Sequence, residues 1–217
     1  MAEGAAPGGH PWFAAVYDSL MAAGERRFMA AEREAVVGGA RGRVLEIGCG
    51  TGLNLPYYTA AATERWAVEP DPFMLARAAR RAAEQGVAVD LRRAPAESLP
   101  FADDFFDTVV STLVLCTVAD PARALAEVRR VLRPGGELRF YEHVRSASRL
   151  GALGQDVVTP LWRRIAAGCH PNRDVAGAIR AAGFTIVALE PKTPVPPVPP
   201  LCVVRPQVRG VARKETR

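Results

Sequence analysis

Three glycines lie directly after an apolar run in the segment RVLEIGCGTGLNLP, at Gly48, Gly50 and Gly52. A glycine loop between a strand and a helix places bare backbone at the carboxyl edge of a parallel sheet, where such folds bind ligands. The spacing here is G-x-G-x-G, whereas the dinucleotide fingerprint is G-x-G-x-x-G, and no G-K-[ST] of a phosphate loop follows. The loop therefore predicts a ligand site that differs from those of dehydrogenases and nucleoside triphosphatases.

Two carboxylates accompany this loop. Glu46 stands two residues before the first glycine, where a negative charge would hold a cationic amino group. Glu69 ends the next strand-like run, at the position where a carboxylate accepts the hydroxyls of a ribose. A ligand that fits both groups carries an ammonium and a ribose. S-adenosylmethionine has both, and we expect it to be the cofactor.

Alternating strand and helix patterns are present to position these residues. The strand-like runs cover residues 44–47, 66–68, 87–91, 108–111 and 138–141, and helical patterns at 73–84 and 122–132 lie between them. Such alternation predicts an α/β fold, a parallel sheet with helices on both faces.

The flanking segments are predicted in less detail. Before the sheet we expect one or two amphipathic helices, at residues 12–37. After it we expect a less regular insert at 145–170, a helix at 172–182, and two strands at 184–189 and about 202–212, which the stiff segment PKTPVPPVPP joins. We interpret residues 1–217 as one domain, with an N-terminal helical lid at 1–40, a cofactor-binding core at 41–143, and an acceptor-side insert with a C-terminal hairpin at 144–217.

Composition limits the classes of partner. The chain has a net charge of +5 and a pI near 9.4, but its arginines are scattered among acidic residues, so we expect no nucleic-acid partner. The nearly apolar run at residues 109–119 is shorter than the roughly 20 residues that span a bilayer. The first residues lack the basic and apolar regions of a signal peptide, which predicts a cytoplasmic protein.

The four cysteines, at positions 49, 116, 169 and 202, show no C-x-x-C spacing. This argues against a zinc site and against a secreted disulfide scaffold, so we expect free thiols and no metal. A nucleophilic role for Cys116 or Cys169 is disfavoured by their apolar surroundings.

Several segments together resemble a known family. EIGCGTG, VEPDPFML, AESLPFADDFFDTVVSTLVLC and RRVLRPGGELRFYEH are similar to the ordered motifs of class I S-adenosylmethionine-dependent methyltransferases (type 11 group), over about residues 43–143. STLVLCTV, EHV, GCHPNRD and AGF are most similar to the alkyl-thiol methyltransferases and their bacterial relatives. The resemblance implies a Rossmann-like, seven-stranded, mostly parallel sheet whose last strand is antiparallel. The mammalian thiol enzymes carry an apolar N-terminal membrane segment that is not found here, so we expect no stable membrane insertion.

The resemblance also assigns roles by position. It implies that the methionine moiety is bound by Glu46, Gly48, Gly50, Asn54, Thr112 and Leu113, and the ribose and adenine by Glu69, Pro70, Met74, Ala96 and Glu97, with Gly52 as a further cofactor-binding residue. Two of these have simpler interpretations, since Met74 in a helix is also expected in a core and Glu97 is also expected as a solvated loop acid.

Methyl transfer from a sulfonium requires chiefly the alignment of donor and acceptor. His143, just after a predicted strand, is the candidate catalytic residue, as a general base or a hydrogen-bond partner of the acceptor; a structural role at the strand end is the alternative. A thiol with a pKa of about 8.5 is already a few per cent thiolate near pH 7 and needs little help. His170, Asn172 and Arg173 are expected to close the pocket, although Asn172 also suits a helix cap.

The sequence therefore predicts a methyltransferase for a small, largely apolar acceptor, and the resemblance to the alkyl-thiol methyltransferases implies that a thiol is the best choice. Aromatic residues in the expected lid, Trp12, Phe13 and Tyr17, favour an apolar acceptor over a sugar. A quinone-precursor or phospholipid methyltransferase is the alternative enzyme. A non-catalytic S-adenosylmethionine-binding domain is the alternative of another class. The oligomeric state is not predicted.

Overall fold

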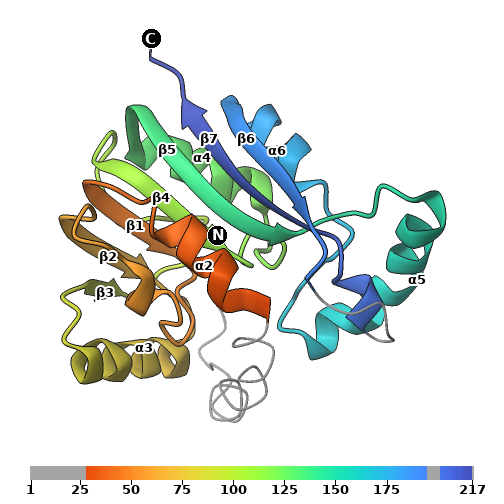
Figure 1. Ribbon diagram of the computed structural model, residues 1–217, viewed down its shortest axis with the longest axis horizontal. Helices are drawn as coiled ribbons and strands as arrows, with labels where there is room; N and C mark the ends of the chain where they lie inside the picture. Colours follow the sequence, from red (N-terminus) through yellow and green to blue (C-terminus); the bar gives the residue numbers. More distant parts are fainter. Residues whose placement is uncertain (1–27, 195–200, 217) are drawn as a thin grey trace, which may run out of the picture.

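A computed structural model describes residues 28–194 and 201–216 of the chain. Its centre is a seven-stranded sheet of order β3-β2-β1-β4-β5-β7-β6 (Figure 1). The strands are β1 (Arg43–Ile47), β2 (Glu64–Val68), β3 (Asp90–Arg92), β4 (Phe106–Thr112), β5 (Leu132–His143), β6 (Phe184–Lys192) and β7 (Gln207–Lys214). Strand β7 pairs antiparallel with both β5 and β6, and the pairs from β3 to β5 are parallel. The predicted fold class is confirmed.

Helices cover both faces of the sheet because successive strand residues point to opposite sides. Val44 and Val110 pack with α2 (Ala30–Val37) in one apolar cluster. Leu45 and Val109 belong to the larger cluster on the other face, with residues of α4 (Pro121–Val131) and α6 (Val175–Ala181). Figure 1 shows α2 in front of the sheet and α4 and α6 behind it.

Proline and aspartate define the starts of the predicted helices. In α3 (Pro72–Gln85) Pro72 occupies the first turn and Asp71 accepts hydrogen bonds from the amides of Phe73 and Met74. In α4 Pro121 and Asp120 play the same parts. An aspartate cap satisfies amides that lack a partner within the helix, and proline is tolerated there because its missing amide hydrogen is not needed. Both predicted helices are therefore confirmed.

The segment after β5 differs from the prediction. Residues 145–170 were expected to be irregular, but α5 (Arg149–Ile165) occupies most of them, capped by Ser148. Gly151, Gly154 and Pro160 lie inside this helix and obscure its pattern in the sequence. It follows β5 and lies beyond the end of the sheet (Figure 1). Its exposed large apolar residues recur at helical spacing, at Leu150, Leu153, Val157, Leu161 and Ile165.

Smaller differences concern the ends of other elements. Strand β3 is shorter than the predicted 87–91, and α6 begins at Val175 because Asp174, not Asn172, accepts from the amide of Gly177. The last strand is β7, whereas Leu201–Val203 forms a 3-10 turn, η3. The hairpin predicted around the proline-rich segment is confirmed as the β6–β7 pair, while residues 195–200 lie outside the described part.

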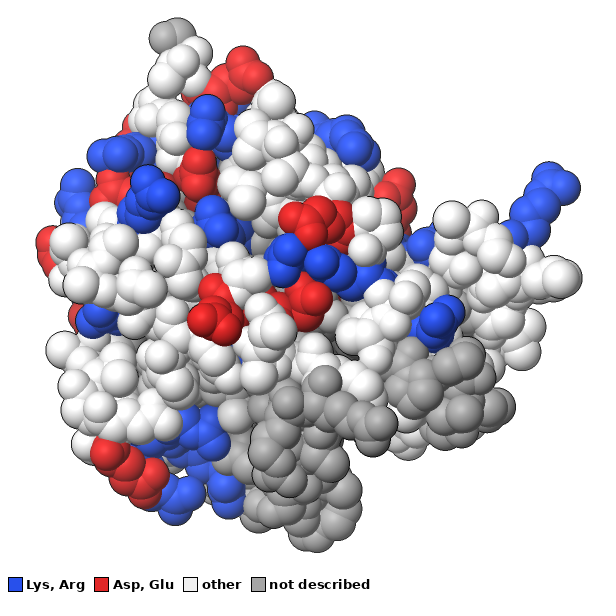
Figure 2. Space-filling model, viewed as in Figure 1, with Lys and Arg blue, Asp and Glu red and all other residues white. Residues whose placement is uncertain are grey.

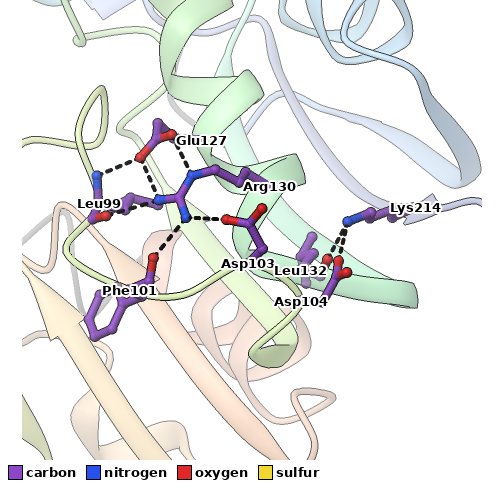
Figure 3. Close-up of polar contacts among 8 residues, drawn as sticks. All are labelled: Leu99, Phe101, Asp103, Asp104, Glu127, Arg130, Leu132 and Lys214. Carbon is purple, nitrogen blue, oxygen red and sulfur yellow. Dashed lines mark hydrogen bonds and ion pairs between the residues drawn. The ribbon is translucent and has the colours of Figure 1, made fainter.

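Side-chain hydrogen bonds hold the edge of the sheet opposite the glycine loop. Arg130 of α4 donates to the carboxylates of Asp103 and Glu127 and to the carbonyl of Phe101 (Figure 3). Lys214 of β7 reaches Asp104 and the Leu132 carbonyl, at 2.6 Å each. These contacts fix the loop before β4, and the candidate site lies at the opposite, carboxyl edge of the sheet.

Candidate functional site

The glycine loop follows β1 at the carboxyl edge of the sheet, as predicted. Gly48 and Gly50 have φ of 59° and 55°, a region that side chains disfavour. A Cβ at Gly48 would lie 2.6 Å from the side chain of Val114, so the loop is packed closely against the turn after β4. A Cβ at Gly50 would meet no atom of the described residues within 4 Å. The backbone at Gly50 is thus open to a ligand, whereas Gly48 serves internal packing.

Glu69 lies beside this loop, just past the end of β2. It is buried, and its two oxygens accept from the amides of Gly50 at 2.9 Å and Asp71 at 3.0 Å. Burial raises the pKa of the carboxyl, and the two amide hydrogen bonds oppose that rise. Each carboxylate oxygen has two lone pairs, so Glu69 retains acceptor capacity at the position predicted for ribose.

Glu46 and Asn54 form a buried network below the loop. The Glu46 carboxylate accepts from Asn54 at 2.9 Å and from the Tyr58 hydroxyl at 2.8 Å. Asn54 also donates to Thr112 at 3.0 Å and accepts from Arg33 at 2.7 Å. Burial raises the pKa of Glu46 to about 7, against the hydrogen bonds and the nearby Arg33 charge. The amide of Asn54 is therefore engaged on both sides by protein groups.

Arg33 and Tyr58 are site residues that sequence reasoning missed. Arg33 is 5% exposed and reaches Asn54 from α2, across 21 positions of the chain. An arginine within an amphipathic helix gives no sign in the sequence that it points inward. Tyr58 follows the 3-10 helix η2 (Leu55–Tyr57), whose proline ends the loop segment. The network brings positive and negative groups together where an amino acid moiety was predicted.

The residues predicted near adenine occupy different environments. Met74 and Ala96 are buried, and Ala96 is part of the main core cluster. Pro70 is exposed, and its carbonyl accepts from Arg93. The Glu97 carboxylate accepts from the amides of Ala119 and Asp120, at 2.9 and 3.3 Å, and so fixes the turn before α4 rather than being a free loop acid. Their contact with adenine stays a prediction.

Strand β4 delivers the residues predicted on the methionine side. Thr112 accepts from Asn54 and so joins the network around Glu46. Leu113 has a φ of 59°, although it is not glycine, and its amide donates to the Tyr141 carbonyl at 2.8 Å. A bulky residue in this conformation carries strain of about 1–3 kcal/mol, which is found preferentially at functional sites. The chain turns sharply there, toward the next group of side chains.

Cys116, His143 and Cys169 come together at the same edge of the sheet. The Nδ1 atom of His143 lies 3.6 Å from the Cys116 sulfur and 3.4 Å from the Cys169 sulfur, and the two sulfurs are 3.8 Å apart. Both thiols are buried, and His143 is partly exposed. The hydrogen bond between the thiols raises the pKa of Cys116 and lowers that of Cys169. Sequence spacing gave no sign of this cluster, because its members come from separate segments.

A buried carboxylate holds the turn that carries Cys116. Oε1 of Glu142 accepts from the Ser111 hydroxyl and from the amides of Val114 and Leu115, at 2.7, 3.0 and 3.1 Å. Its Oε2 accepts from the amide of Cys116 at 3.1 Å. Sequence reasoning missed Glu142, although it directly precedes His143.

The predicted pocket-closing residues also support this turn. Arg173 donates to the carbonyls of Leu115 and Val118, at 2.8 Å each, and the His170 amide donates to the Cys116 carbonyl at 2.7 Å. Asn172 instead donates to Asp156 of α5. The predicted lid residues Trp12, Phe13 and Tyr17 lie outside the described residues.

Comparisons with known proteins identify related sequences. The family profile described as "Methyltransferase domain" matches residues 45–140. Human thiol S-methyltransferase TMT1A is 33% identical over 184 residues, covering 82% of this chain and 74% of the relative. Human thiol S-methyltransferase TMT1B is 38% identical over 162 residues, covering 72% of this chain. The chain spans slightly less than two thirds of the TMT1B relatives, 66% of the human and 63% of the rat protein.

A bacterial relative and a solved structure extend the comparison. Phosphatidylethanolamine N-methyltransferase of Cereibacter sphaeroides is 43% identical over 107 residues, covering 47% of this chain and 51% of the relative. A structure from Thermotoga maritima, described as an S-adenosylmethionine-dependent and possible histamine N-methyltransferase, superposes with a TM-score of 0.69 at 25% identity. The superposition covers 94% of this chain and 98% of that structure.

Proposed function

We propose that this chain, which belongs to the class I S-adenosylmethionine-dependent methyltransferases, transfers a methyl group to a small, largely apolar acceptor, and that the acceptor is a thiol. The observation that carries the proposal is the loop at Gly50, whose backbone is open on the ligand side and faces the Glu69 carboxylate. The choice of a thiol is supported by the similarity to the thiol S-methyltransferases.

The residues around the glycine loop fit the cofactor. The space at Gly50, which a side chain would fill, allows a ligand to approach the backbone, and Glu69 can accept ribose hydroxyls with its remaining lone pairs. Glu46 supplies negative charge for the ammonium when its carboxyl is ionised, and its oxygens accept hydrogen bonds from Asn54 and Tyr58 and so orient those two side chains. The remaining predicted contacts, at Gly48, Gly52, Pro70, Met74, Ala96, Glu97, Thr112 and Leu113, are part of the same proposal.

The chain's task at the acceptor side is to exclude water and to remove a proton. The bound cofactor supplies an electrophilic methyl group, so that one carbon–sulfur bond forms on the acceptor as the sulfonium bond breaks and its electron pair stays on the departing sulfur. A thiol must lose its proton before it attacks. His143 remains the proposed group for this step, but its Nδ1 lies against two thiols of the protein, so any direct contact with the acceptor proton uses Nε2.

The segments outside the cofactor-binding core are proposed to enclose the acceptor. Residues 1–40 would act as a lid, and residues 144–217 would form the acceptor side. Within the described ranges, no helix combines the length and the apolar character needed to cross a bilayer. Basic and acidic side chains are interspersed on the face drawn in Figure 2, which supports a small-molecule acceptor over nucleic acid. We further propose a cytoplasmic location.

The first test is calorimetric titration with S-adenosylhomocysteine. We expect Glu69→Ala to weaken binding at least about tenfold, since a ribose that loses both its hydrogen-bond acceptors costs about 1.4 kcal/mol or more. Glu64→Ala is the matched control, because Glu64 is exposed at the opposite end of β2. Mass spectrometry of products from simple thiols then tests the acceptor. If folded wild type did not bind S-adenosylhomocysteine, the proposal would be removed and a non-catalytic domain would be supported instead.

A phospholipid amine is the second candidate acceptor. It is favoured by the exposed apolar residues of α5 and by the similarity to the phosphatidylethanolamine enzyme. Vesicles of phosphatidylethanolamine and soluble thiols should be offered in parallel. Methylation of the lipid amine without any thioether product would exclude the thiol, and a quinone precursor offered in a third reaction tests the remaining alternative in the same way.

A further inference from the structure

The cluster of Cys116, His143 and Cys169 combines ligand types that a soft metal ion prefers. Cys116 lies in the turn after β4, His143 ends β5, and Cys169 lies between α5 and α6. Their ligand atoms all lie within 4.8 Å of one another. Thiolate sulfur and imidazole nitrogen are the usual ligands of Zn²⁺ in proteins. We propose that these three side chains form a binding site for one zinc ion, with a fourth coordination position open to an exogenous ligand.

The distances within the cluster match the edges of a tetrahedron around zinc. With Zn–S bonds of about 2.3 Å and Zn–N bonds of about 2.0–2.1 Å, a tetrahedral site has S···S edges of about 3.8 Å and S···N edges of about 3.5 Å. The observed separations are 3.8 Å between the sulfurs, and 3.6 and 3.4 Å from the sulfurs to Nδ1. An ion can therefore be placed between the three atoms with little movement of the side chains.

The surroundings hold these ligands in place before any ion binds. Glu142 and Arg173 fix the backbone of the turn around Cys116, and the His170 amide binds the Cys116 carbonyl. A ligand whose backbone is already fixed loses less entropy on coordination. Two thiolates and one Zn²⁺ also sum to zero charge, which suits the burial of both cysteines.

The fourth position points to a use for the ion. Among the described residues, no other histidine, cysteine or carboxylate joins the group, and a three-ligand zinc site is typical of sites that bind water or substrate. If the proposed function holds, the acceptor thiol is the ligand for this position: it binds zinc as a thiolate and releases its proton to solvent. His143 then acts as a zinc ligand, and zinc takes over the activation that was assigned to a base.

Metal content and cobalt spectra test the site without any methyl transfer. Wild-type protein, purified with reductant, should contain about one zinc per chain; after zinc removal, Co²⁺ should give tetrahedral d–d bands and sulfur-to-cobalt charge-transfer bands. The double variant Cys116→Ser/Cys169→Ser should lose these bands. His143→Ala should weaken Co²⁺ binding at least about tenfold. Cys202→Ser is the matched control, since Cys202 is exposed and outside the cluster, and should behave as wild type.

Several results would overturn the zinc site. Folded, reduced wild type that binds neither ion at micromolar concentration, or a double variant that retains the cobalt bands, would do so. A Cys116–Cys169 disulfide that persists in the protein isolated without reductant, with no zinc present, would indicate a thiol pair instead. Far-UV circular dichroism and S-adenosylhomocysteine binding show whether each variant is folded, so loss of the metal is not confused with loss of the fold.

The role of the open position is tested separately. Addition of a small thiol to the Co²⁺ protein should change the intensity and position of the charge-transfer bands, because a further sulfur joins the ion. An alcohol of the same size is the control. Unchanged bands would remove the acceptor role but leave the metal site. Absence of S-adenosylhomocysteine binding with intact cobalt bands would remove the proposed function alone, so the two failures can be distinguished.

Discussion

Two regions at the carboxyl edge of one sheet are built from different chemistry. The cofactor-side region, Glu46, Gly50, Asn54 and Glu69, combines open backbone with oxygen acceptors that protein donors already occupy. The acceptor-side cluster, Cys116, His143 and Cys169, places soft sulfur atoms against an imidazole. Oxygen acceptors suit hydroxyl and ammonium groups, whereas sulfur and imidazole suit a soft metal or a thiol. The difference suggests that each region can be lost without the other.

The strongest test of this separation is Gly50→Val. The new side chain would fill a space where the described residues place no atom within 4 Å of the added Cβ, so S-adenosylhomocysteine binding should fall at least about a hundredfold, or about 2.7 kcal/mol. Calorimetry measures this loss, and cobalt binding at the acceptor-side cluster should be unchanged. A variant that loses both S-adenosylhomocysteine binding and cobalt binding would contradict the separation of the two regions.

Gly86→Val provides the control for backbone strain. Gly86 has a φ of 64° and follows the end of α3, and within the part of the chain that the structure describes a Cβ there also meets no atom within 4 Å. Both substitutions should therefore lower the free energy of unfolding by a similar amount, of the order of 1–2 kcal/mol. Only the change at Gly50 should alter ligand binding. Equal binding losses in the two variants would show that strain, rather than the blocked approach, is responsible.

The second test acts on the other region, through Glu142→Gln. Glutamine can keep the oxygen that accepts from Ser111, Val114 and Leu115, but its amide group would then face the Cys116 amide, and two donors would meet. We expect the free energy of unfolding to fall by about 2–3 kcal/mol in urea titrations. Cobalt binding should weaken, because the turn carrying Cys116 shifts.

Glu137→Gln is the control on the same strand. Glu137 is partly exposed and pairs with Arg213 at 2.9 Å, so its replacement should cost no more than about 1 kcal/mol. S-adenosylhomocysteine binding should change less than about threefold in both variants. A large loss of that binding in Glu142→Gln would mean that the two regions are coupled through β4, where Thr112 accepts from Asn54.

The placement of the residues proposed to bind the cofactor could be predicted because their signals are local. The glycines, Glu46 and Glu69 lie between residues 46 and 69, and the strand–loop–helix pattern fixes their place at the edge of a parallel sheet. The mostly parallel, seven-stranded sheet and its antiparallel last strand followed from the family resemblance, whereas the order of the strands was not predicted. What was missed there, Arg33 and Tyr58, depends on which way a side chain points, and the hydrophobic pattern does not encode that.

The acceptor-side cluster could not be predicted because its residues meet only through the sheet topology. Cys116 and Cys169 are 53 positions apart, and His143 lies 27 positions from Cys116. No local spacing rule covers such separations. The helix α5 was missed for a different reason: two glycines and Pro160 lower its intrinsic propensity, and Gln155 holds it through hydrogen bonds to the carbonyls of Pro171 and Val203. Tertiary contacts therefore decided the structure of this segment.

The smallest expected effect concerns the charge of Glu46. Its pKa is raised to about 7 in the folded protein, so the folded state holds a proton that the unfolded chain releases near its usual value of 4.5. The contribution of this proton to the free energy of unfolding is fully present below pH 4.5 and is lost as the pH rises through 7. Glu46→Gln cannot titrate, but it can still accept from Asn54 and donate to the Tyr58 hydroxyl.

We therefore expect the free energy of unfolding of wild type, relative to Glu46→Gln, to fall by about 1 kcal/mol between pH 6 and pH 7. Urea titrations at these two pH values measure the difference, and the histidines contribute equally to both proteins and cancel. Glu64→Gln, at an exposed position, should run parallel to wild type. A Glu46→Gln variant that also runs parallel would mean that Glu46 is ionised throughout this range. The Glu46 carboxylate would then carry its negative charge throughout this pH range, and binding of the ammonium group would not require Glu46 to lose a proton first.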